Sequence, residues 1–297
     1  KYEAALSESG ATSAEASARK AAFEKEWALV NSADTARDLV DATILDPAVK
    51  AIDKQFVGQP LVAAELQVVV GVRYQVLGLF DKALPLLQSA LATRRKLLGN
   101  DNPVTQESVF ALADDLRAMN RQSEAEPLLR ENVEVRRRLL GADHPESLEA
   151  ISKLGIVLDE QGKYAEALPY YQQSLAGYQR VLGDNDQHTL TKLNDLGFLM
   201  EDLGKDDEAE RYYRQALPGL RQVLGKDHGD TLTTTSNLGG LLSRHGRYDE
   251  AEPFLREALE GGVGGPLAQL VVADPGGDLA ALRGGSSVAP EQRRADH

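Results

Sequence analysis

The fold is decided by residues 140–183, which read LGADHPESLEAISKLGIVLDEQGKYAEALPYYQQSLAGYQRVLG. A Leu-Gly pair opens this stretch and another closes it, and further pairs stand before and after it. The glycines of these pairs are each 42 residues apart, at Gly99, Gly141, Gly183 and Gly225. Internal repeats of this length indicate a solenoid or a propeller and not a single globular core.

Other positions recur in the same register. One column holds only alanine: Ala83, Ala125, Ala167, Ala209 and Ala251. A second holds small residues, which mark a close crossing of two helices: Gly71, Ala113, Gly155, Gly197 and Gly239. A third holds the residue types that most easily adopt the left-handed conformation that ends helices: Gly78, Asn120, Gly162, Gly204 and Gly246. Each repeat is therefore predicted to be a helix, a tight turn and a second helix.

Helical periodicity is clear in the third repeat. Leu148, Ile151, Leu154 and Leu158 follow spacings of three and four, which place them on one face of a helix. A propeller blade needs four short strands with alternating apolar residues, and the sequence has no such alternation. A column of prolines is expected in the first turn of the second helix, where a missing N–H costs no hydrogen bond: Pro85, Pro127, Pro169 and Pro253.

Residues of the third and fifth repeats resemble the tetratricopeptide signature. They are Leu154-Gly155, Gly162, Tyr164, Ala167 and Tyr171, with Leu238-Gly239, Gly246, Tyr248 and Ala251. The long period and the inter-repeat segment 140–148 are similar to the kinesin-light-chain subtype of that family. The resemblance implies an all-α, right-handed solenoid over residues 61–260, with about five repeats at 61–104, 105–146, 147–188, 189–230 and 231–260.

A second resemblance concerns the segment before the repeats. The residues concerned run from Leu45-Asp46-Pro47 to Ile52-Asp53 and continue with QPLVAA at 59–64. They are similar to the segment that opens the repeat region of bacterial serine/threonine protein kinases with C-terminal tetratricopeptide repeats. In that family a kinase domain and a membrane helix come first, and residues 13–40 resemble the linker that follows them. This resemblance implies the sensory or docking region of such a kinase, without its catalytic part.

The two ends of the chain differ from the repeats. Residues 1–45 are rich in Ala, Ser and Glu and are expected to form a helical, juxtamembrane-like linker. In residues 46–60, Asp46 is expected to cap a short helix that covers the first repeat. Residues 261–297 are Gly-rich and are expected to be a disordered tail. Because the fifth repeat stops midway through its second helix, this tail is either natural or the product of a shifted reading frame.

Composition favours an interaction protein. The formal net charge is −13, from 46 acidic and 33 basic residues, which disfavours nucleic acid and anionic membranes as partners. The sequence has no cysteine, which excludes disulfides and thiolate metal sites, and no apolar run near the roughly 20 residues that cross a bilayer. It begins at Lys1 without a signal-peptide pattern, so we expect a fragment or a processed product, and the localisation is left open.

The sequence has no motif for catalysis or phosphate binding, such as a P-loop, a nucleophile elbow or the loops of a kinase. His144, His188 and His228 fall in successive inter-repeat turns, so neighbours are expected to be about 8–10 Å apart, too far to share a metal ion. The adjacent carboxylates Asp159 and Glu160 are interpreted as solvated charges. We therefore expect no enzyme, no cofactor and no metal site.

The resemblance implies a concave groove lined by the first helix of each repeat. Side chains two positions before and after the Leu-Gly column, with the next turn of each helix, are expected to point into it. They are Phe110, Asp114, Arg117, Lys153, Ile156, Asp159, Asn194, Asp195, Phe198, Glu201, Ser236 and Asn237, with Ser152 and Ser243 beside them.

The side chains of this groove predict the chemistry of its partner. Asn194 and Asn237 each donate and accept hydrogen bonds, as the backbone of an extended peptide requires. Phe110 and Phe198 suit an apolar side chain, and their acidic neighbours favour Lys or Arg on the ligand. We expect a scaffold that binds a basic or basic-aromatic segment of a protein. The alternative left open is a hydrated groove, with both phenylalanines partly in the core.

Overall fold

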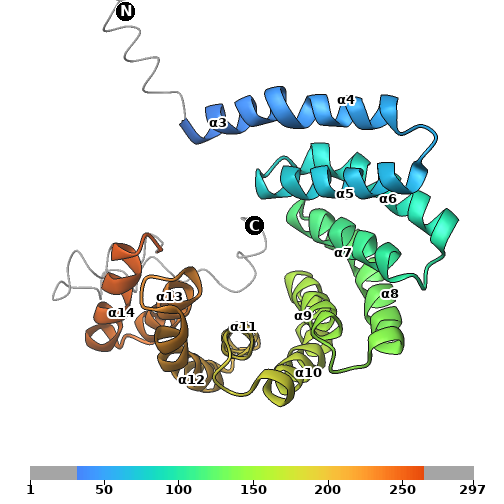
Figure 1. Cartoon of the computed structure of the whole chain (residues 1–297). Helices are drawn as coiled ribbons and strands as arrows, with labels where there is room; N and C mark the ends of the chain where they lie inside the picture. The colour runs from blue at the N-terminus through green and yellow to red at the C-terminus, as the bar shows by residue number, and fades with distance from the viewer. Residues whose placement is uncertain (1–31, 264–297) are drawn as a thin grey trace, which may run out of the picture. The chain divides into compact units, whose positions relative to one another are not determined.

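The computed structural model describes residues 32–263, and every regular element in that range is a helix (Figure 1). The chain divides into two compact units, residues 1–119 and residues 120–297. The described part of the first unit contains α3 (Ser32–Val40), η1 (Asp41–Leu45), α4 (Asp46–Gln55), α5 (Pro60–Val76), α6 (Phe80–Leu98) and α7 (Pro103–Ala118). That of the second contains α8 (Gln122–Leu140), α9 (Pro145–Glu160), α10 (Tyr164–Leu182), α11 (Gln187–Asp202), α12 (Asp206–Leu224), α13 (Gly229–Arg244) and α14 (Tyr248–Glu260).

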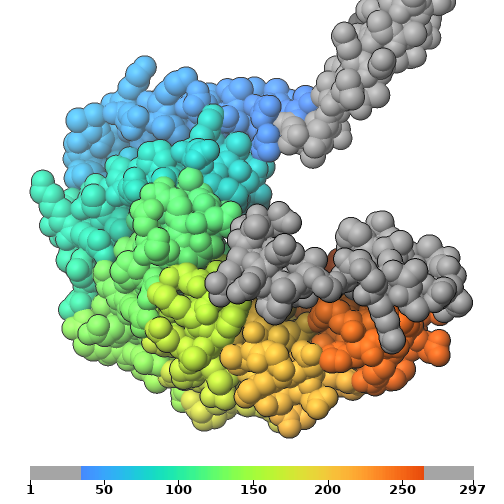
Figure 2. Space-filling view, turned by 180° about the vertical axis from the view of Figure 1, so that it is seen from behind, coloured from blue at the N-terminus to red at the C-terminus, as the bar shows by residue number. Residues whose placement is uncertain are grey.

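Helices that follow one another along the chain pack side by side within each unit. In the first unit α5 packs against α6 and α6 against α7, and in the second unit each helix from α8 to α13 packs against the next. Figure 2 shows the successive helices of the second unit as one continuous surface from green to orange. This packing confirms the expected all-α solenoid of helix-turn-helix repeats.

The repeated columns have the structural roles that their residue types predict. Leu148, Ile151 and Leu154 are buried, which confirms the apolar face of the first helix. Gly162 ends that helix with a φ of +72°. A Cβ added to Gly197 would lie 2.6 Å from Cε1 of Tyr213, so the first and second helices of this repeat cross too closely for a larger residue.

The expectation that the proline column lies in the first turn of the second helices is wrong. Pro85 is the sixth residue of α6, and Pro127, Pro169 and Pro253 are likewise inside their helices. A proline there leaves the carbonyl four residues earlier without its intrahelical partner. These prolines are exposed, so water can hydrogen-bond to the carbonyl, and the helix tolerates the ring.

The segment before the first repeat is one uninterrupted helical run from Ser32 to Gln55. The expected cap at Asp46 is wrong, since Asp46 has helical φ and ψ angles and its carboxylate accepts a hydrogen bond from Lys50 Nζ at 2.8 Å. The π-helical turn η1 lies just before Pro47 and gives room for its ring. Ile52 is 5% exposed and α4 packs against α5, as expected of a helix that covers the first repeat.

The last helix is shorter than its equivalents. α14 has 13 residues, whereas α6, α8, α10 and α12 each have 19. The tail expected beyond it and most of the N-terminal linker fall in 264–297 and 1–31, outside the described residues. Between residues 32 and 263, no helix is both long and apolar enough to cross a membrane.

Candidate functional site

The residues predicted to line the groove lie on the first helices α7, α9, α11 and α13. Three of them, on α7, belong to the first compact unit. Among these, Phe110 is half-buried, and the Asp114 carboxylate forms an ion pair of 3.4 Å with Nε of Arg117. The other predicted residues lie on the helices of the second unit, which therefore holds the candidate site.

On α9, one predicted groove residue is not where the sequence placed it. Lys153 and Ile156 are half-buried. Asp159 is only 7% exposed, so the interpretation of its carboxylate as a solvated charge is wrong. Its neighbour Glu160 is exposed, as expected.

The Asp159 carboxylate is held between helices. The Tyr171 hydroxyl, from α10, donates to its Oδ2 at 3.0 Å, while its Oδ1 is buried with no hydrogen-bond partner among the described residues. Burial raises the pKa of Asp159 to about 7, and the nearby charges of Asp202, Glu160 and Asp195 add to the rise, against the Tyr171 hydrogen bond. Burial beside this carboxyl also raises the pKa of Tyr171 far above its ordinary value.

Polar residues on α11 link it to the first helices on either side. Lys192 Nζ donates to the Asp195 carboxylate at 2.6 Å and to Ser152 Oγ of α9 at 2.8 Å. The Asn237 side-chain amide, from α13, donates to Oδ1 of Asn194 at 3.1 Å. This bond joins two repeats and uses one N–H of Asn237 and one acceptor site of Asn194, so each asparagine keeps further hydrogen-bonding capacity.

The C-terminal turn of α11 carries a second carboxylate held by a tyrosine. The Tyr213 hydroxyl donates to Oε1 of Glu201 at 2.7 Å. The guanidinium of Arg244, from α13, forms an ion pair with the same carboxylate. Ser236 on α13 is half-buried, and Ser243 is only 3% exposed, so the latter is not a groove residue.

Phe198 is the exposed apolar residue of this face. Its side chain is 50% exposed, three residues after Asp195 and four before Asp202 on the same helix. The other half of the side chain is buried, as the alternative of a phenylalanine partly in the core also requires. The half-buried Ile156 stands at the same repeat position on α9, 42 residues earlier.

Carboxylates dominate the three first helices of the second unit. α9, α11 and α13 together carry eight Asp or Glu residues and three Lys or Arg residues. The excess of negative charge favours a cationic ligand on this face, and the exposed phenylalanine gives such a ligand an apolar contact.

The histidines of the inter-repeat turns begin helices. Nδ1 of His144 accepts a hydrogen bond from the backbone N–H of Glu146 at 3.3 Å, and His228 caps α13 in the same way. His188 follows the capping residue Asp186. No cluster of three or more potential metal-ligating residues is present between residues 32 and 263.

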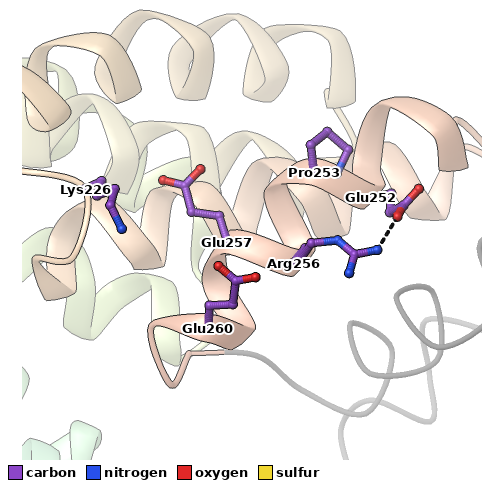
Figure 3. A pocket seen from close by; sticks show the side chains of 6 residues that line it. All are labelled: Lys226, Glu252, Pro253, Arg256, Glu257 and Glu260. Carbon is purple, nitrogen blue, oxygen red and sulfur yellow. Dashed lines mark hydrogen bonds and ion pairs between the residues drawn. The ribbon is translucent and has the colours of Figure 1, made fainter.

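A surface hollow lies beside α14 (Figure 3). It is lined by Lys226, Glu252, Pro253, Arg256, Glu257 and Glu260. Arg256 pairs with Glu252 at 2.5 Å, and Glu257 pairs with Arg221 at 2.6 Å. The residues that line this hollow include no aromatic side chain, so it is a weaker candidate than the face around the exposed Phe198.

Comparison with known proteins shows the family. The family model described as "Tetratricopeptide repeat" matches residues 63–131, 123–180 and 188–261. The chain belongs to the tetratricopeptide repeat family. Only tetratricopeptide repeats are detected in it, and among curated proteins none matches the chain.

Solved structures share the tetratricopeptide fold at low sequence identity. Nearly identical kinesin-light-chain TPR-like repeats from Podosopora anserina are 24% identical, with a TM-score of 0.57 over 67% of this chain and 95% of that one. BtubC (BKLC) from P. vanneervenii is 18% identical, with a TM-score of 0.61 over 78% and 91%. The apo quorum sensor NprR from B. thuringiensis is 14% identical, with a TM-score of 0.60 over 95% and 79%. The array is thus similar in structure to kinesin-light-chain-like repeats.

Three residues of this tetratricopeptide face were not predicted from the sequence. Lys192 donates to the carboxylate of Asp195. Arg244 and Tyr213 both contact the carboxylate of Glu201. The tyrosine could have been found, because Tyr171 and Tyr213 each follow a buried or half-buried carboxylate of the preceding helix by 12 residues. The two cations have no equivalent at the same position of the other repeats, so no column reveals them.

Proposed function

We propose that the face formed by α9, α11 and α13 binds an extended segment of a partner protein, and that this segment carries a basic residue beside an apolar or aromatic one. Tetratricopeptide arrays generally mediate protein–protein interactions through the extended surface that stacked repeats create. The proposal goes further in naming the face and the chemistry of the partner.

The observation that carries the proposal is the exposure of Phe198 among acidic residues. A half-exposed phenylalanine offers apolar area whose burial by a ligand stabilises the complex by roughly 25 cal/mol per Å². Asp202, one turn further along α11, is exposed, and Asp195 is half-buried one turn before. Acidic residues outnumber basic ones on α9, α11 and α13, so a cation next to the apolar group of the ligand is favoured.

A peptide selection tests the proposal. A random peptide display library is selected against the full chain, and the enriched peptides are then measured against Phe198→Ala and Val223→Ala. Val223 is a matched control, because it is 47% exposed but lies at the end of the second helix α12. We expect basic-aromatic peptides whose affinity falls at least tenfold in Phe198→Ala and stays within twofold in the control.

Two results would contradict the proposal. One is the absence of enrichment, and the other is enrichment of peptides that bind Phe198→Ala as well as the unchanged chain. The expected alternative, a sensory or docking region of a bacterial serine/threonine kinase, stays a prediction, since the family model that matches the chain describes only the tetratricopeptide repeats. Reading the coding DNA upstream of Lys1 for a kinase frame tests that alternative.

A further inference from the structure

Two successive junctions of the array place a carboxylate, a tyrosine and a third group at the same repeat positions. At the α11/α13 junction, Glu201 accepts a hydrogen bond from Tyr213 and pairs with the guanidinium of Arg244. The carboxylate there is satisfied from two sides. A tyrosine on the second helix supplies one partner, and a cation 43 residues further along the chain supplies the other.

The α9/α11 junction has the first two groups but not the cation. Asp159 occupies the position of Glu201, and Tyr171 that of Tyr213, 42 residues earlier in each case. The residue 43 positions after Asp159 is Asp202, an acid where the next junction has arginine. Correspondingly, Oδ1 of Asp159 is buried and has no hydrogen-bond partner among residues 32–263.

We propose that the α9/α11 junction binds the side chain of an arginine in the partner segment, a proposal that rests on the proposed function. The guanidinium of this arginine lies beside Asp159 and Asp202. It occupies the position that Arg244 occupies at the α11/α13 junction. The geometry of approach is given by Arg244 itself. It reaches Glu201 from the neighbouring first helix α13, and Asp202, the residue next to Glu201 on α11, is exposed.

Two features favour arginine over lysine. A guanidinium presents several N–H groups in one plane, which suits two carboxylates that stand close together, whereas an ammonium is a point charge. Phe198 lies one turn before Asp202 on α11 with half of its side chain exposed, and a planar guanidinium or its aliphatic stem packs well on an aromatic ring.

The charge around Asp159 supports the same conclusion. Its pKa is raised by burial and by the carboxylates of Asp202, Glu160 and Asp195, while the Tyr171 hydroxyl lowers it. Lys192 is already engaged by Asp195 and Ser152. An incoming cation is favoured here by the Asp159 carboxylate, whose buried Oδ1 has no hydrogen-bond partner among the described residues.

The test titrates the isotopically labelled full chain with N-acetyl-arginine amide, N-acetyl-lysine amide and N-acetyl-norleucine amide, followed by NMR. The first probe is expected to bind with about millimolar affinity, at least fivefold tighter than the lysine probe, and to shift resonances of α9 and α11. In Asp159→Asn the arginine probe should bind at least tenfold more weakly. Asp207→Asn is the control, because it removes one exposed carboxylate from the second helix α12, outside the candidate site.

A second variant supplies the missing cation within the chain. Asp202→Arg should abolish binding of the arginine probe and raise the unfolding temperature by about 2–4 °C, relative to Asp207→Arg, which makes the same charge change at an exposed position of α12. Equal binding of the arginine probe to the unchanged chain, Asp159→Asn and Asp202→Arg would overturn the proposal.

The selected peptides separate this proposal from the function on which it rests. Peptides that lose affinity in Phe198→Ala but contain no preferred arginine and bind Asp159→Asn normally would overturn the arginine site and leave the proposed function standing. Binding of the arginine probe that depends on Asp159, without any enriched peptide, would support the site and count against the peptide-binding function.

Discussion

Replacing Asp159 by asparagine is expected to stabilise the protein at alkaline pH. The residue is 7% exposed, and its pKa of about 7 results first from burial and then from the charge of Asp202. Asparagine has nearly the same size and keeps an oxygen that accepts the Tyr171 hydrogen bond, but it carries no charge. The substitution therefore removes the cost of the buried charge and leaves the packing between α9 and α10 in place.

The magnitude follows from the shift of the pKa. Because the folded-state pKa is raised from the ordinary value of 3.8 to about 7, the protonated carboxyl stabilises the fold fully below the ordinary value, and this contribution is lost as the pH rises through about 7. A shift of about three units corresponds to about 4 kcal/mol once the group is ionised. About half of it, roughly 2 kcal/mol, is lost between about pH 5.5 and pH 8.5.

Urea unfolding followed by circular dichroism at these two pH values measures the effect. The gain in free energy of unfolding of Asp159→Asn over the unchanged chain should be about 2 kcal/mol larger at the higher pH. Asp207→Asn, which removes one exposed carboxylate from α12, is the control for the loss of one negative charge. A gain for Asp159→Asn that is the same at both pH values, or a loss at the higher one, would refute the reasoning.

Three further predictions concern the packing and charge of the repeats. Gly197→Ala should lower the free energy of unfolding by about 1–3 kcal/mol, because its Cβ would lie 2.6 Å from a tyrosine ring. Gly240→Ala, whose Cβ would have its nearest atom at 3.6 Å, should raise the free energy of unfolding by about 0.5–1 kcal/mol. Thermal unfolding of both variants measures these changes. Arg136→Met should lower the free energy of unfolding by about 1–3 kcal/mol, because the buried guanidinium of Arg136 donates to a backbone carbonyl of α9 at 2.9 Å. Arg138 is exposed, so Arg138→Met should change the free energy of unfolding by less than about 0.5 kcal/mol. Urea unfolding of both variants measures these changes. Hydrogen bonds from a lysine, a glutamine and an arginine hold the pKa of Glu126 at about 2, so its contribution is present above its ordinary value of 4.5 and lost as the pH falls through about 2. Glu126→Gln should therefore cost about 1–3 kcal/mol at neutral pH and less than half of that near pH 2, as urea midpoints at both pH values would show.

The turns and helix crossings could be predicted from the sequence because backbone geometry restricts the residue type there. Asn120, at a φ of +56°, and Gly162, at +72°, both need the left-handed conformation. Gly197 has no room for a side chain. Such requirements act within one repeat and recur in every repeat, so a column of one residue type reveals them without any knowledge of the partners in space.

The helix starts were predicted less well, because a proline or a capping residue type can stand both at the start of a helix and inside it. Pro85 marks the interior of a helix and not its first turn, since an exposed carbonyl can exchange its intrahelical partner for water. Asp46 has the residue type of a helix cap, but the π-helical turn η1 continues the helix through it. In both cases the side chain alone does not show whether solvent or a helix satisfies the backbone.

The polar contacts of the site depend on pairs that the repeat pattern does not predict. Asn194 meets Asn237, and Glu201 meets Arg244, each pair 43 residues apart. Their neighbours in the column do not form the same pairs, since the residues change from repeat to repeat. The sequence therefore predicted which helix face carries the polar groups, but not which of them are already engaged.

The two properties of Asp159, its cost to stability and its value to a ligand, are linked by thermodynamics. A bound guanidinium favours the ionised carboxylate, so binding lowers the pKa of Asp159, and by reciprocity the affinity for the guanidinium rises as the carboxylate ionises. Affinity should thus increase up to about pH 7 and level off above it, since Asp159 is ionised above that pH and Tyr171, whose pKa is raised far above its ordinary value, stays neutral. In Asp159→Asn this rise should disappear together with the pH-dependent instability. Loss of one without the other would mean that the carboxylate that destabilises the α9/α11 junction is not the one that binds the ligand.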